Sequence, residues 1–299
     1  MQWLRISILF LLLQPLYALS SALDRDMVIL TSKEFEGRPS GAQSPHRSAY
    51  YIMRQFEKLK LDVKFSSFEF KRGFFETGTG HNVVATKSCT FAQCEPAIIF
   101  TAHYDHLGGG EYRHYPGAND NATGVAVMMD IARRLDNLEF KRDLVFVATD
   151  AEEKGLHGAK HFVSQLGKTR VLMNINLDML NIQKRNTLYA LASRDLKPMK
   201  EQIESHFNTQ PVKLNLYFSS KRMARKLNAP QIDWLRASDH YPFHRAKIPF
   251  IYFGSGVDEH HHSMDDSLDK INLEKLSQVS QSITGLVQSL AKLSASDTS

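Results

Sequence analysis

The sequence predicts an α/β protein, a three-layer α/β/α domain whose central twisted sheet is mixed and mostly parallel. The first observation is that short apolar runs typical of buried strands alternate along the chain with helical segments. The second is the composition: of 299 residues, 42% are hydrophobic and 23% charged, which excludes a disordered, collagenous or coiled-coil chain. Such sheets carry helices on both faces and bind ligands at the carboxyl ends of their strands. Functional residues are therefore expected at those ends.

The individual elements follow from periodicity and from the turn residues between them. Apolar residues recur at helical spacing over residues 24–61, interrupted by the turn sequence at residues 37–41. Alternating or continuous apolar runs predict strands at residues 63–70, 82–85, 97–102, 143–149, 171–177 and 249–254. Helical spacing predicts helices at residues 124–135, 158–166, 197–207 and 273–293. The polar stretch at residues 208–236 has no clear pattern, and residues 213–236 are a candidate lid.

Residues 1–20 have the pattern of a secretory signal peptide. Arg5 supplies a positive charge, residues 6–13 form an unbroken apolar run, and small residues mark a cleavage site after Ser20 or Ala22. A transmembrane anchor needs about 20 apolar residues, and Gln14 interrupts this run, although an uncleaved anchor is the alternative. We expect residues 21–299 to form a single domain that is secreted or periplasmic, without membrane contact once the leader is removed.

The two cysteines, Cys89 and Cys94, lie in one short polar loop. Because an exported chain meets an oxidising environment, we expect them to pair and to contribute about 2 kcal/mol by closing this loop. The alternative is a metal-binding pair of thiols, but the second pair that completes a structural zinc site is missing.

The charge balance does not indicate a nucleic-acid partner. The formal net charge is +5 and the pI is near 9.0, with basic residues spread evenly along the chain. We therefore expect no nucleic acid, and the sequence does not determine an oligomeric state.

His103 follows the predicted strand at residues 97–102 directly, and Asp105 comes two residues later. A zinc-binding imidazole has its second ring nitrogen held by a partner, and a neighbouring carboxylate is a common one. A buried histidine at a strand end is an equally ordinary role, so His103 alone does not define a site.

Asp120, Glu152 and Glu153 occupy comparable positions. Asp120 lies in a turn-rich run before the helix at residues 124–135, where capping the helix is the more frequent role of aspartate. Glu152 and Glu153 lie just past the strand at residues 143–149. Adjacent glutamates are usually solvated, but burial at a strand end would require them to bind a cation or hold a proton.

Two more strands end in the same way. Asp178 closes the strand at residues 171–177, and a histidine triplet at residues 260–262 follows the strand at residues 249–254, although such a triplet can also decorate a surface. The strand ends of one sheet would bring the whole set to one rim: His103, Asp120, Glu152, Glu153, Asp178 and His262.

These side chains suit divalent metal chemistry. Two imidazoles and three carboxylates fit zinc in mixed nitrogen and oxygen coordination, and they can hold two ions if one carboxylate bridges. One glutamate is then left unbound. In two-metal sites, ions about 3.5–4 Å apart share a water whose acidity they raise, and a free carboxylate can take its proton. The residues predict a metal-assisted hydrolase.

The ordered set of motifs resembles the di-zinc aminopeptidases of metallopeptidase family 28. The motifs are His103-Tyr104-Asp105, Gly117-Ala118-Asn119-Asp120-Asn121-Ala122-Thr123-Gly124, Ala151-Glu152-Glu153-Lys154-Gly155, Asn176-Leu177-Asp178-Met179, Ser238-Asp239-His240 and His262-Ser263-Met264-Asp265-Asp266. The similarity runs from about Glu34 to the terminal helix and includes Phe35-Glu36-Gly37-Arg38-Pro39-Ser40-Gly41. It implies a zinc-exopeptidase-like fold and a single metallopeptidase catalytic domain over residues 21–299.

The resemblance implies a pair of zinc ions. By motif, His103 and Asp178 bind one Zn²⁺, Glu153 and His262 bind the other, and Asp120 bridges them. The choice of His262 within the histidine triplet rests on the family's His-Ser/Thr-x-x-Asp spacing.

The resemblance also implies roles around the ions. Glu152 is expected to be the general base, Asp105 to orient His103, and Asp239 to lie just outside the ligands. The peptide bond between Asp120 and Asn121 is expected to be cis, a form that surrounding contacts have to enforce.

His261 departs from the family pattern. Relatives commonly have a tyrosine immediately before the last ligand, where it helps to hold the substrate carbonyl. We expect His261 to donate this hydrogen bond when suitably protonated, or the metal to take over the task.

The function that the resemblance implies is an exported aminopeptidase acting on peptides with a free amino terminus. One alternative is a glutaminyl cyclase, which shares the fold but uses one zinc ion for an intramolecular acyl transfer. The run from Asp150 to Ala159 follows the peptidase pattern without the insertion expected of the cyclase. A second alternative is a non-catalytic binding protein on this scaffold, although such proteins usually lose ligands and here none is missing.

Overall fold

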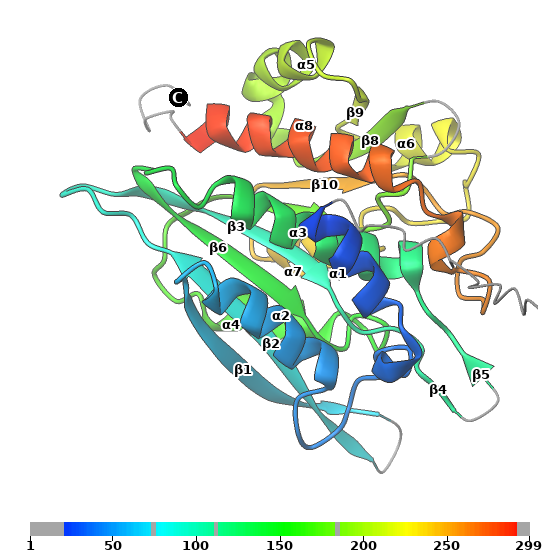
Figure 1. Cartoon of the computed structure of the whole chain (residues 1–299). Coiled ribbons are helices and arrows are strands. Elements are labelled where there is room, and N and C mark those ends of the chain that lie inside the picture. Colours follow the sequence, from blue (N-terminus) through cyan, green and yellow to red (C-terminus); the bar gives the residue numbers. More distant parts are fainter. Residues whose placement is uncertain (1–20, 73–75, 111–112, 183–185, 292–299) are drawn as a thin grey trace, which may run out of the picture.

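The computed structural model describes residues 21–72, 76–110, 113–182 and 186–291, and its centre is an eight-stranded sheet. The order across the sheet is β1-β2-β6-β3-β7-β10-β8-β9 (Figure 1). The strands are β1 (Asp62–Lys71), β2 (Thr77–Lys87), β3 (Glu95–His103), β6 (Arg142–Thr149), β7 (Val171–Leu177), β8 (Thr187–Ala192), β9 (Lys213–Tyr217) and β10 (Phe250–Gly254). Strands β6, β3, β7 and β10 are parallel neighbours, whereas β1, β2 and β6 pair antiparallel, as do β10 and β8. The predicted mixed, mostly parallel sheet is confirmed.

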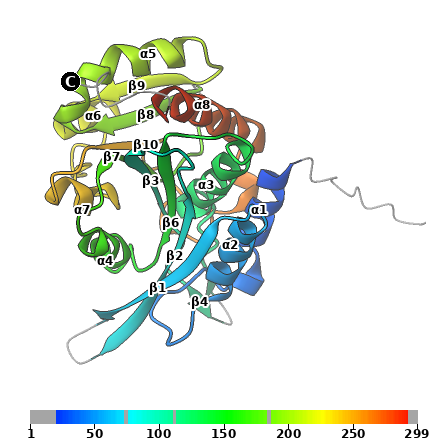
Figure 2. The ribbon, with the colours of Figure 1, turned by 90° about the vertical axis from the view of Figure 1, so that its left-hand side faces the viewer.

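Helices cover both faces of this sheet, which gives the three layers (Figure 2). One face carries α1 (Ala22–Leu30), α2 (Arg47–Glu57), α3 (Thr123–Arg134) and α8 (Leu273–Ala291), and the other carries α4 (His157–Gln165) and α7 (His240–Arg245). Helices α5 (Lys200–Asn208) and α6 (Ser220–Lys226) lie near β8 and β9. A separate small ladder joins β4 (Gly109–Gly110) to β5 (Arg113–His114).

The alternation of side chains along β3 explains why both faces are apolar. Ile98 and Phe100 pack into the core beneath α3 and α8, while Ile99 joins a second cluster with Phe162 of α4 and Phe243 of α7. Because successive residues of a strand point to opposite faces, a continuous apolar run such as residues 97–102 is buried on both sides.

Several parts of the chain differ from the prediction, among them strand β8 and helix α7, which the sequence analysis did not predict. The helical spacing over residues 24–61 belongs to two helices, α1 and α2. Helix α1 already ends at Leu30, and the left-handed backbone angles of Glu36, Gly37 and Arg38 follow a short 3-10 turn at Lys33–Phe35, which agrees with the predicted interruption. The predicted lid is wrong for its first part, since residues 213–217 form β9 of the main sheet and pair with β8. The alternation of Lys213, Leu214 and Asn215 is that of a half-buried edge strand, which the polar composition obscured.

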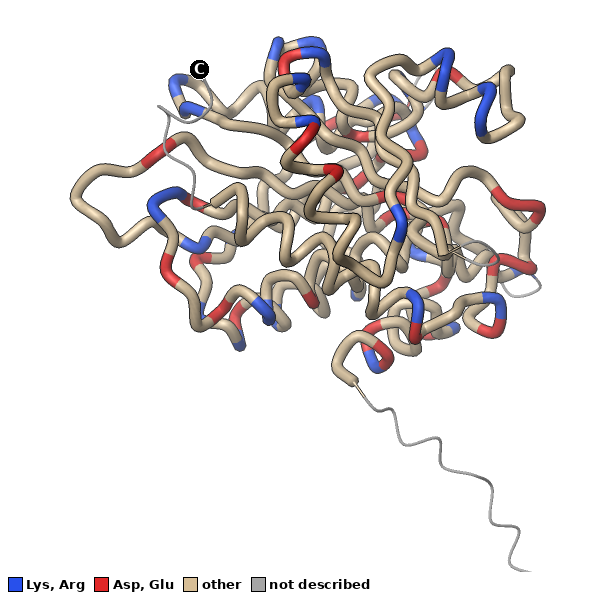
Figure 3. The backbone as a smooth tube through the Cα atoms, turned by 90° about the horizontal axis from the view of Figure 1, so that it is seen from above, with Lys and Arg blue, Asp and Glu red and all other residues tan. Residues whose placement is uncertain are grey.

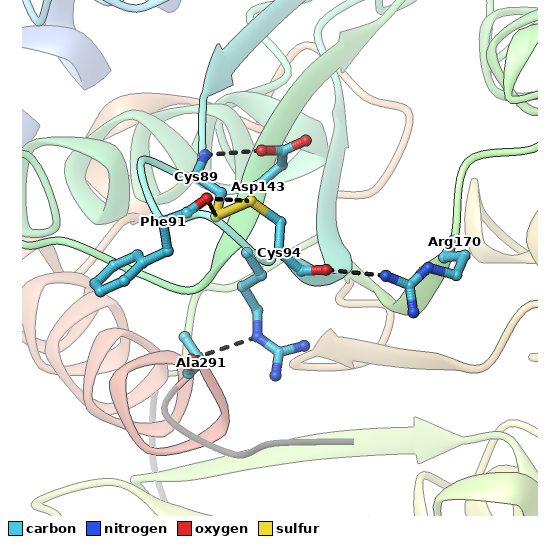
Figure 4. Close-up of a disulfide and its surroundings, with 7 residues drawn as sticks. Cys89, Phe91, Cys94, Asp143, Arg170 and Ala291 are labelled. Atoms are coloured by element: carbon cyan, nitrogen blue, oxygen red, sulfur yellow. Dashed lines mark hydrogen bonds between the residues drawn. A yellow bond between two sulfur atoms is a disulfide. The ribbon is translucent and has the colours of Figure 1, made fainter.

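Cys89 and Cys94 form the predicted disulfide (Figure 4). The loop that it closes is held at both ends, because the Cys89 amide donates to Asp143 over 2.8 Å and Arg170 donates to the Cys94 carbonyl over 2.9 Å. The disulfide therefore fixes a surface turn at the opposite end of β3 from His103.

Basic and acidic residues are interspersed over most of the backbone (Figure 3). Within the described residues, no helix combines the length and the hydropathy needed to cross a membrane. The predicted leader at residues 1–20 and the last residues of the predicted terminal helix, 292 and 293, lie outside the described residues.

Candidate metal centre

Three adjacent parallel strands deliver the first predicted site residues to one edge of the sheet. His103 is the last residue of β3, Glu152 and Glu153 follow the end of β6, and Asp178 follows the end of β7. Strand β3 lies between β6 and β7, so their carboxyl ends are neighbours. This is the arrangement that the sequence predicted from strand ends alone.

Asp120 lies at the middle of the cluster. Its carboxylate is 3.3 Å from His103 Nε2 on one oxygen, and on the other it is 3.2 Å from His262 Nε2 and 3.3 Å from His261 Nε2. The two oxygens of Asp120 thus face different imidazoles, which is the geometry that a bridging carboxylate needs.

The remaining candidate ligands group on either side of Asp120. His103 Nε2 is 3.5 Å from Asp178, and the ligand atoms of His103, Asp120 and Asp178 all lie within 4.8 Å of one another. On the other side, His262 Nε2 is 3.2 Å from Glu153. The five predicted ligands therefore lie close together. His103, Asp120 and Asp178 form one group of ligand atoms, while on the other side His106 groups with Asp120 and Glu153, and His261 groups with Asp120 and His262.

The loop that carries Asp120 is fixed by hydrogen bonds from its backbone amides to the side chain of Asp266. The Asp266 carboxylate accepts from the amides of Asn119 over 2.7 Å and Asp120 over 3.0 Å, and the peptide bond between Asp120 and Asn121 is cis, as expected. Helix α3 has Ala122 at its N-cap position, so Asp120 does not cap it. The capping role considered for Asp120 is excluded.

Asp105 holds the two glutamates in place. Its buried carboxylate accepts the amide N–H of Glu152 over 3.0 Å and that of Glu153 over 3.3 Å. His103 Nδ1 donates to the backbone carbonyl of Asp105 over 3.1 Å, while the carboxylate is 3.8 Å away. Asp105 thus orients His103 through its main chain and the Glu152–Glu153 turn through its side chain.

Glu152 differs electrostatically from Glu153. Burial raises the pKa of Glu152 well above its usual range, opposed by His103 and reinforced by Asp239 and Asp178. Burial also acts on Glu153, but hydrogen bonds from His106 and His262 outweigh it and lower its pKa to about 2. A carboxylate with raised proton affinity suits the acceptance of a proton, and one with lowered affinity suits the binding of a cation.

His106 is a site residue that the sequence did not single out. It is buried, its Nδ1 lies 2.9 Å from Glu153 and 3.7 Å from Asp120, and its Nε2 has no hydrogen-bond partner among the described residues. His106 directly follows His103-Tyr104-Asp105, and this position next to a candidate ligand was the sequence feature that could have identified it as a site residue.

Arg38 is the second residue whose role was missed. Its fully buried guanidinium donates to five backbone carbonyls, those of Leu30, Tyr104, Pro116, Gly117 and Asp120. Burial lowers the pKa of Arg38 to about 10, opposed by the nearby carboxylates of Asp120 and Asp266, so it stays charged at neutral pH. Arg38 joins the loops of His103 and Asp120 and places a positive charge behind the acidic cluster.

Within the histidine triplet, two rings face Asp120 and one does not. His261 and His262 stack with ring centroids 3.8 Å apart, whereas the contact recorded for the His260 ring is Glu259, at 3.9 Å. Hydrogen bonds to Asp120 and Glu153 raise the pKa of His262 to about 10. His261 and His262 are thus about equally close to Asp120. The contact that distinguishes them is the one between His262 and Glu153, which His261 does not share among the described ion pairs.

Asp239 lies next to this cluster, as the resemblance implied. Thr149 donates a short hydrogen bond to one oxygen of Asp239, and the other oxygen has no hydrogen-bond partner among the described residues. The same is true of Asp178 Oδ1. Buried carboxylate oxygens without donors, beside two imidazoles, fit a site completed by divalent cations.

Strained backbone also gathers here. Three described non-glycine residues of the site have left-handed backbone angles. Ala151 directly precedes the glutamate pair, Met179 directly follows Asp178, and His262 is itself a candidate ligand. Side chains disfavour this conformation, and it persists where surrounding contacts enforce it, most often at functional sites.

The fold and the ligand set are those of a metal-dependent exopeptidase-like domain, and comparisons with known proteins agree. A model of Peptidase family M28 matches residues 82–287, and the chain belongs to this family. Its relatives include a probable zinc metalloprotease of Leptosphaeria maculans, so zinc is the implied metal. The chain is 30% identical over 230 residues to aminopeptidase YwaD of Bacillus subtilis (strain 168), covering 73% of this chain and 46% of that protein.

Two solved structures illustrate the range of proteins with this fold. A zinc aminopeptidase from Bacillus subtilis, BSAP, superposes with a TM-score of 0.71 at 19% identity, covering 90% of this chain and 95% of that one. A glutaminyl cyclase from Fimbriiglobus ruber superposes with a TM-score of 0.67 at 20% identity, covering 89% and 94%. The chain spans about half the length of the first curated relatives, 46–48% of each.

Proposed function

We propose that this chain is an exported zinc-dependent aminopeptidase that releases amino-terminal residues from peptides. The observation that carries this proposal is the convergence of four candidate ligands around a fifth, Asp120, with Glu152 next to Glu153 and outside the groups of ligand atoms that the structure describes. Two Zn²⁺ ions are proposed, one held by His103 and Asp178, the other by Glu153 and His262, with Asp120 shared.

The bound metal would polarise the scissile carbonyl and lower the pKa of water. The protein's own residues supply the rest. Glu152 accepts the proton of the attacking water and passes it to the leaving amine, for which its raised pKa suits it. The Asp105 carboxylate fixes the turn that carries Glu152 by accepting its amide N–H. Asp239 is proposed to position the same segment, because it accepts a hydrogen bond from Thr149 at the end of β6. The free α-amine of the substrate is proposed to lie among the acidic groups of the same site.

His261 is proposed to hold the substrate carbonyl. Its side chain is 30% exposed and lies at the rim of the cluster, where a substrate can reach it. We expect His261→Ala to lower kcat by about 10²-fold, the effect of losing one hydrogen bond to developing charge, while zinc content stays the same. Turnover measured beside zinc content checks this, with His260→Ala as the matched control. Loss of zinc in His261→Ala would instead make His261 a ligand, and normal turnover would remove it from the mechanism.

The structural likeness to a glutaminyl cyclase makes cyclisation the second candidate activity. A peptide that begins with glutamine separates the two. An aminopeptidase releases free glutamine and a shortened peptide, whereas a cyclase releases ammonia and leaves the number of residues unchanged. We expect the zinc-loaded protein to give the shortened peptide, and mass spectrometry of the products checks this. Ammonia release without shortening would contradict the aminopeptidase proposal.

Export is proposed from the predicted leader at residues 1–20 and is supported by the disulfide. Disulfides persist in oxidising compartments, which include the periplasm and the cell exterior. Peptides with a free amino terminus are the proposed partners, with no nucleic acid and no membrane contact after leader removal. Amino-terminal sequencing of the mature protein, expected to start after Ser20 or Ala22, tests the leader directly.

A further inference from the structure

Helix α6 carries a group of cations without counterions. Lys221, Arg222, Arg225 and Lys226 are all exposed on this short helix. None of the four side chains forms a salt bridge or a hydrogen bond with any residue that the structure describes. Like charges so close together repel one another, so an anionic partner would lower the free energy of this surface.

Two of these cations face a surface pocket. Lys221 and Arg225, one helical turn apart, line a cavity of about 730 Å³ between α6 and residues 230–235. Its wall is otherwise largely apolar, with Ala224, Pro230, Ile232 and Leu235. A cavity with an apolar wall and two cations fits a side chain that combines methylene groups with a carboxylate.

The pocket's one acidic side chain does not neutralise these cations. Asp233 accepts the Leu235 amide over 3.2 Å and the Ser220 hydroxyl over 3.5 Å, and it lies 3.5 Å from Arg236. Among the described residues its ion-pair partner is Arg236, which does not line the pocket, and it forms no ion pair with Lys221 or Arg225.

The pocket lies close to the candidate metal centre. Leu235 on its wall is four residues from Asp239, a separation of at most about 14 Å even for extended chain. Trp234, the neighbour of Leu235, packs on Tyr252 with ring centroids 6.2 Å apart, and the Tyr252 hydroxyl donates to the Asp178 carbonyl over 3.4 Å. A peptide bound at the metal centre can thus place one of its first few side chains in the pocket.

The carboxyl end of α6 also lies near a loop that contacts the candidate metal centre. Leu227 lies against Gly256, and Lys226 and Leu227 share a second cavity of about 310 Å³ with Asp258. Asp258 accepts a hydrogen bond from Asn119, the neighbour of Asp120, over 2.8 Å. In Figure 1, α6 accordingly lies on the side of the molecule toward which the arrow of β10 points.

We propose that the pocket between α6 and residues 230–235 binds an acidic side chain of the peptide substrate, with Lys221 and Arg225 holding its carboxylate. This selection rests on the proposed peptidase function. The guanidinium of Arg225 can hold a carboxylate with two parallel hydrogen bonds, and the Lys221 ammonium adds a point charge. Peptides with glutamate at the matching position would then be preferred over their glutamine counterparts.

The test uses peptides in which glutamate or glutamine occupies each of the first few positions in turn. For the zinc-loaded wild type, we expect kcat/KM to be about fivefold higher for glutamate than for glutamine at one position, the upper end for an exposed ion pair. In the double variant Lys221→Ala/Arg225→Ala, this ratio is expected to fall to about one. In Lys221→Glu/Arg225→Glu it is expected to drop below one, with lysine preferred at that position. The glutamate preference should also weaken as salt is added.

Arg222→Ala is the matched control, because it removes the same charge from the same helix but does not line the pocket. We expect the glutamate-to-glutamine ratio to be unchanged in this variant, and thermal melting confirms that each variant is folded. A ratio near one in the wild type, a ratio unaffected in the double variant, or an equal loss in Arg222→Ala would overturn the proposal.

Failure of the peptidase proposal is distinguishable from failure of this one. If no peptide is cleaved, the proposed function fails, and calorimetric binding of the same peptides to the zinc-loaded protein decides the pocket. Tighter binding of a glutamate peptide that is lost in Lys221→Ala/Arg225→Ala supports the pocket, and equal binding of both peptides excludes it.

Discussion

Glu152→Gln is expected to lower kcat by about 10²–10⁴-fold, the contribution typical of a general base, without loss of zinc. The amide keeps the size of the side chain and the backbone hydrogen bond from Glu152 to Asp105 but cannot accept the proton. The effect should appear in kcat for release of amino acids from peptides. Zinc content measured on the same sample separates this loss from loss of the metal.

The adjacent glutamate provides the matched comparison. Glu153 contacts both His106 and His262, and its pKa is lowered to about 2, so it is proposed to bind zinc and not to carry protons. Glu153→Gln is therefore expected to lose zinc affinity as well as activity. Near-normal turnover of Glu152→Gln, with zinc bound, would remove Glu152 from its proposed role.

Asp120→Ala is expected to weaken both zinc sites together, because this carboxylate faces His103 with one oxygen and His262 with the other. The loss of affinity should exceed the about 10–100-fold that removal of a residue outside the ligands costs. Activity should fall to background at any zinc concentration that saturates the wild type. Zinc titration by calorimetry measures the effect, with circular dichroism to verify the fold.

Asp178→Ala is the control for Asp120→Ala. Asp178 contacts His103 and belongs to one ligand group only, so its loss should weaken one site and spare the other. If Asp120→Ala still bound two zinc ions as tightly as the wild type, a shared carboxylate would have no part in the site.

The strand ends are the part of the site that the sequence predicted well. The apolar runs before His103 and Asp178 are long enough to identify buried strands, and parallel strands of one sheet end at one edge. The residues after those runs therefore had to lie near one another, and the contact of His103 with Asp178 agrees.

Asp120 shows the limit of a local argument. Its position before a helix predicts a capping role, but the Asp120–Asn121 segment has non-helical angles and the helix begins beyond it. Hydrogen bonds that its amides donate to a residue far along the chain, Asp266, set this loop. Tertiary contacts of this kind override local propensity and are not encoded in periodicity.

His106 and Arg38 were missed for a related reason. The importance of Arg38 lies in hydrogen bonds to Tyr104, Pro116 and Gly117, all distant in sequence. A single arginine next to a turn has no periodic signal, and its complete burial is visible only in the fold. The edge strand β9 was missed because it lies in a polar stretch of the chain. The alternation of polar and apolar residues in Lys213–Tyr217 is too short to stand out from that polar composition.

Anomalous diffraction at the zinc absorption edge, from crystals of the zinc-loaded protein, tests the central claim most directly. We expect two peaks about 3.5–4 Å apart, one beside His103 and Asp178 and the other beside Glu153 and His262, with Asp120 between them. A single peak, or peaks away from Asp120, would contradict a bridged pair of zinc ions at this edge of the sheet.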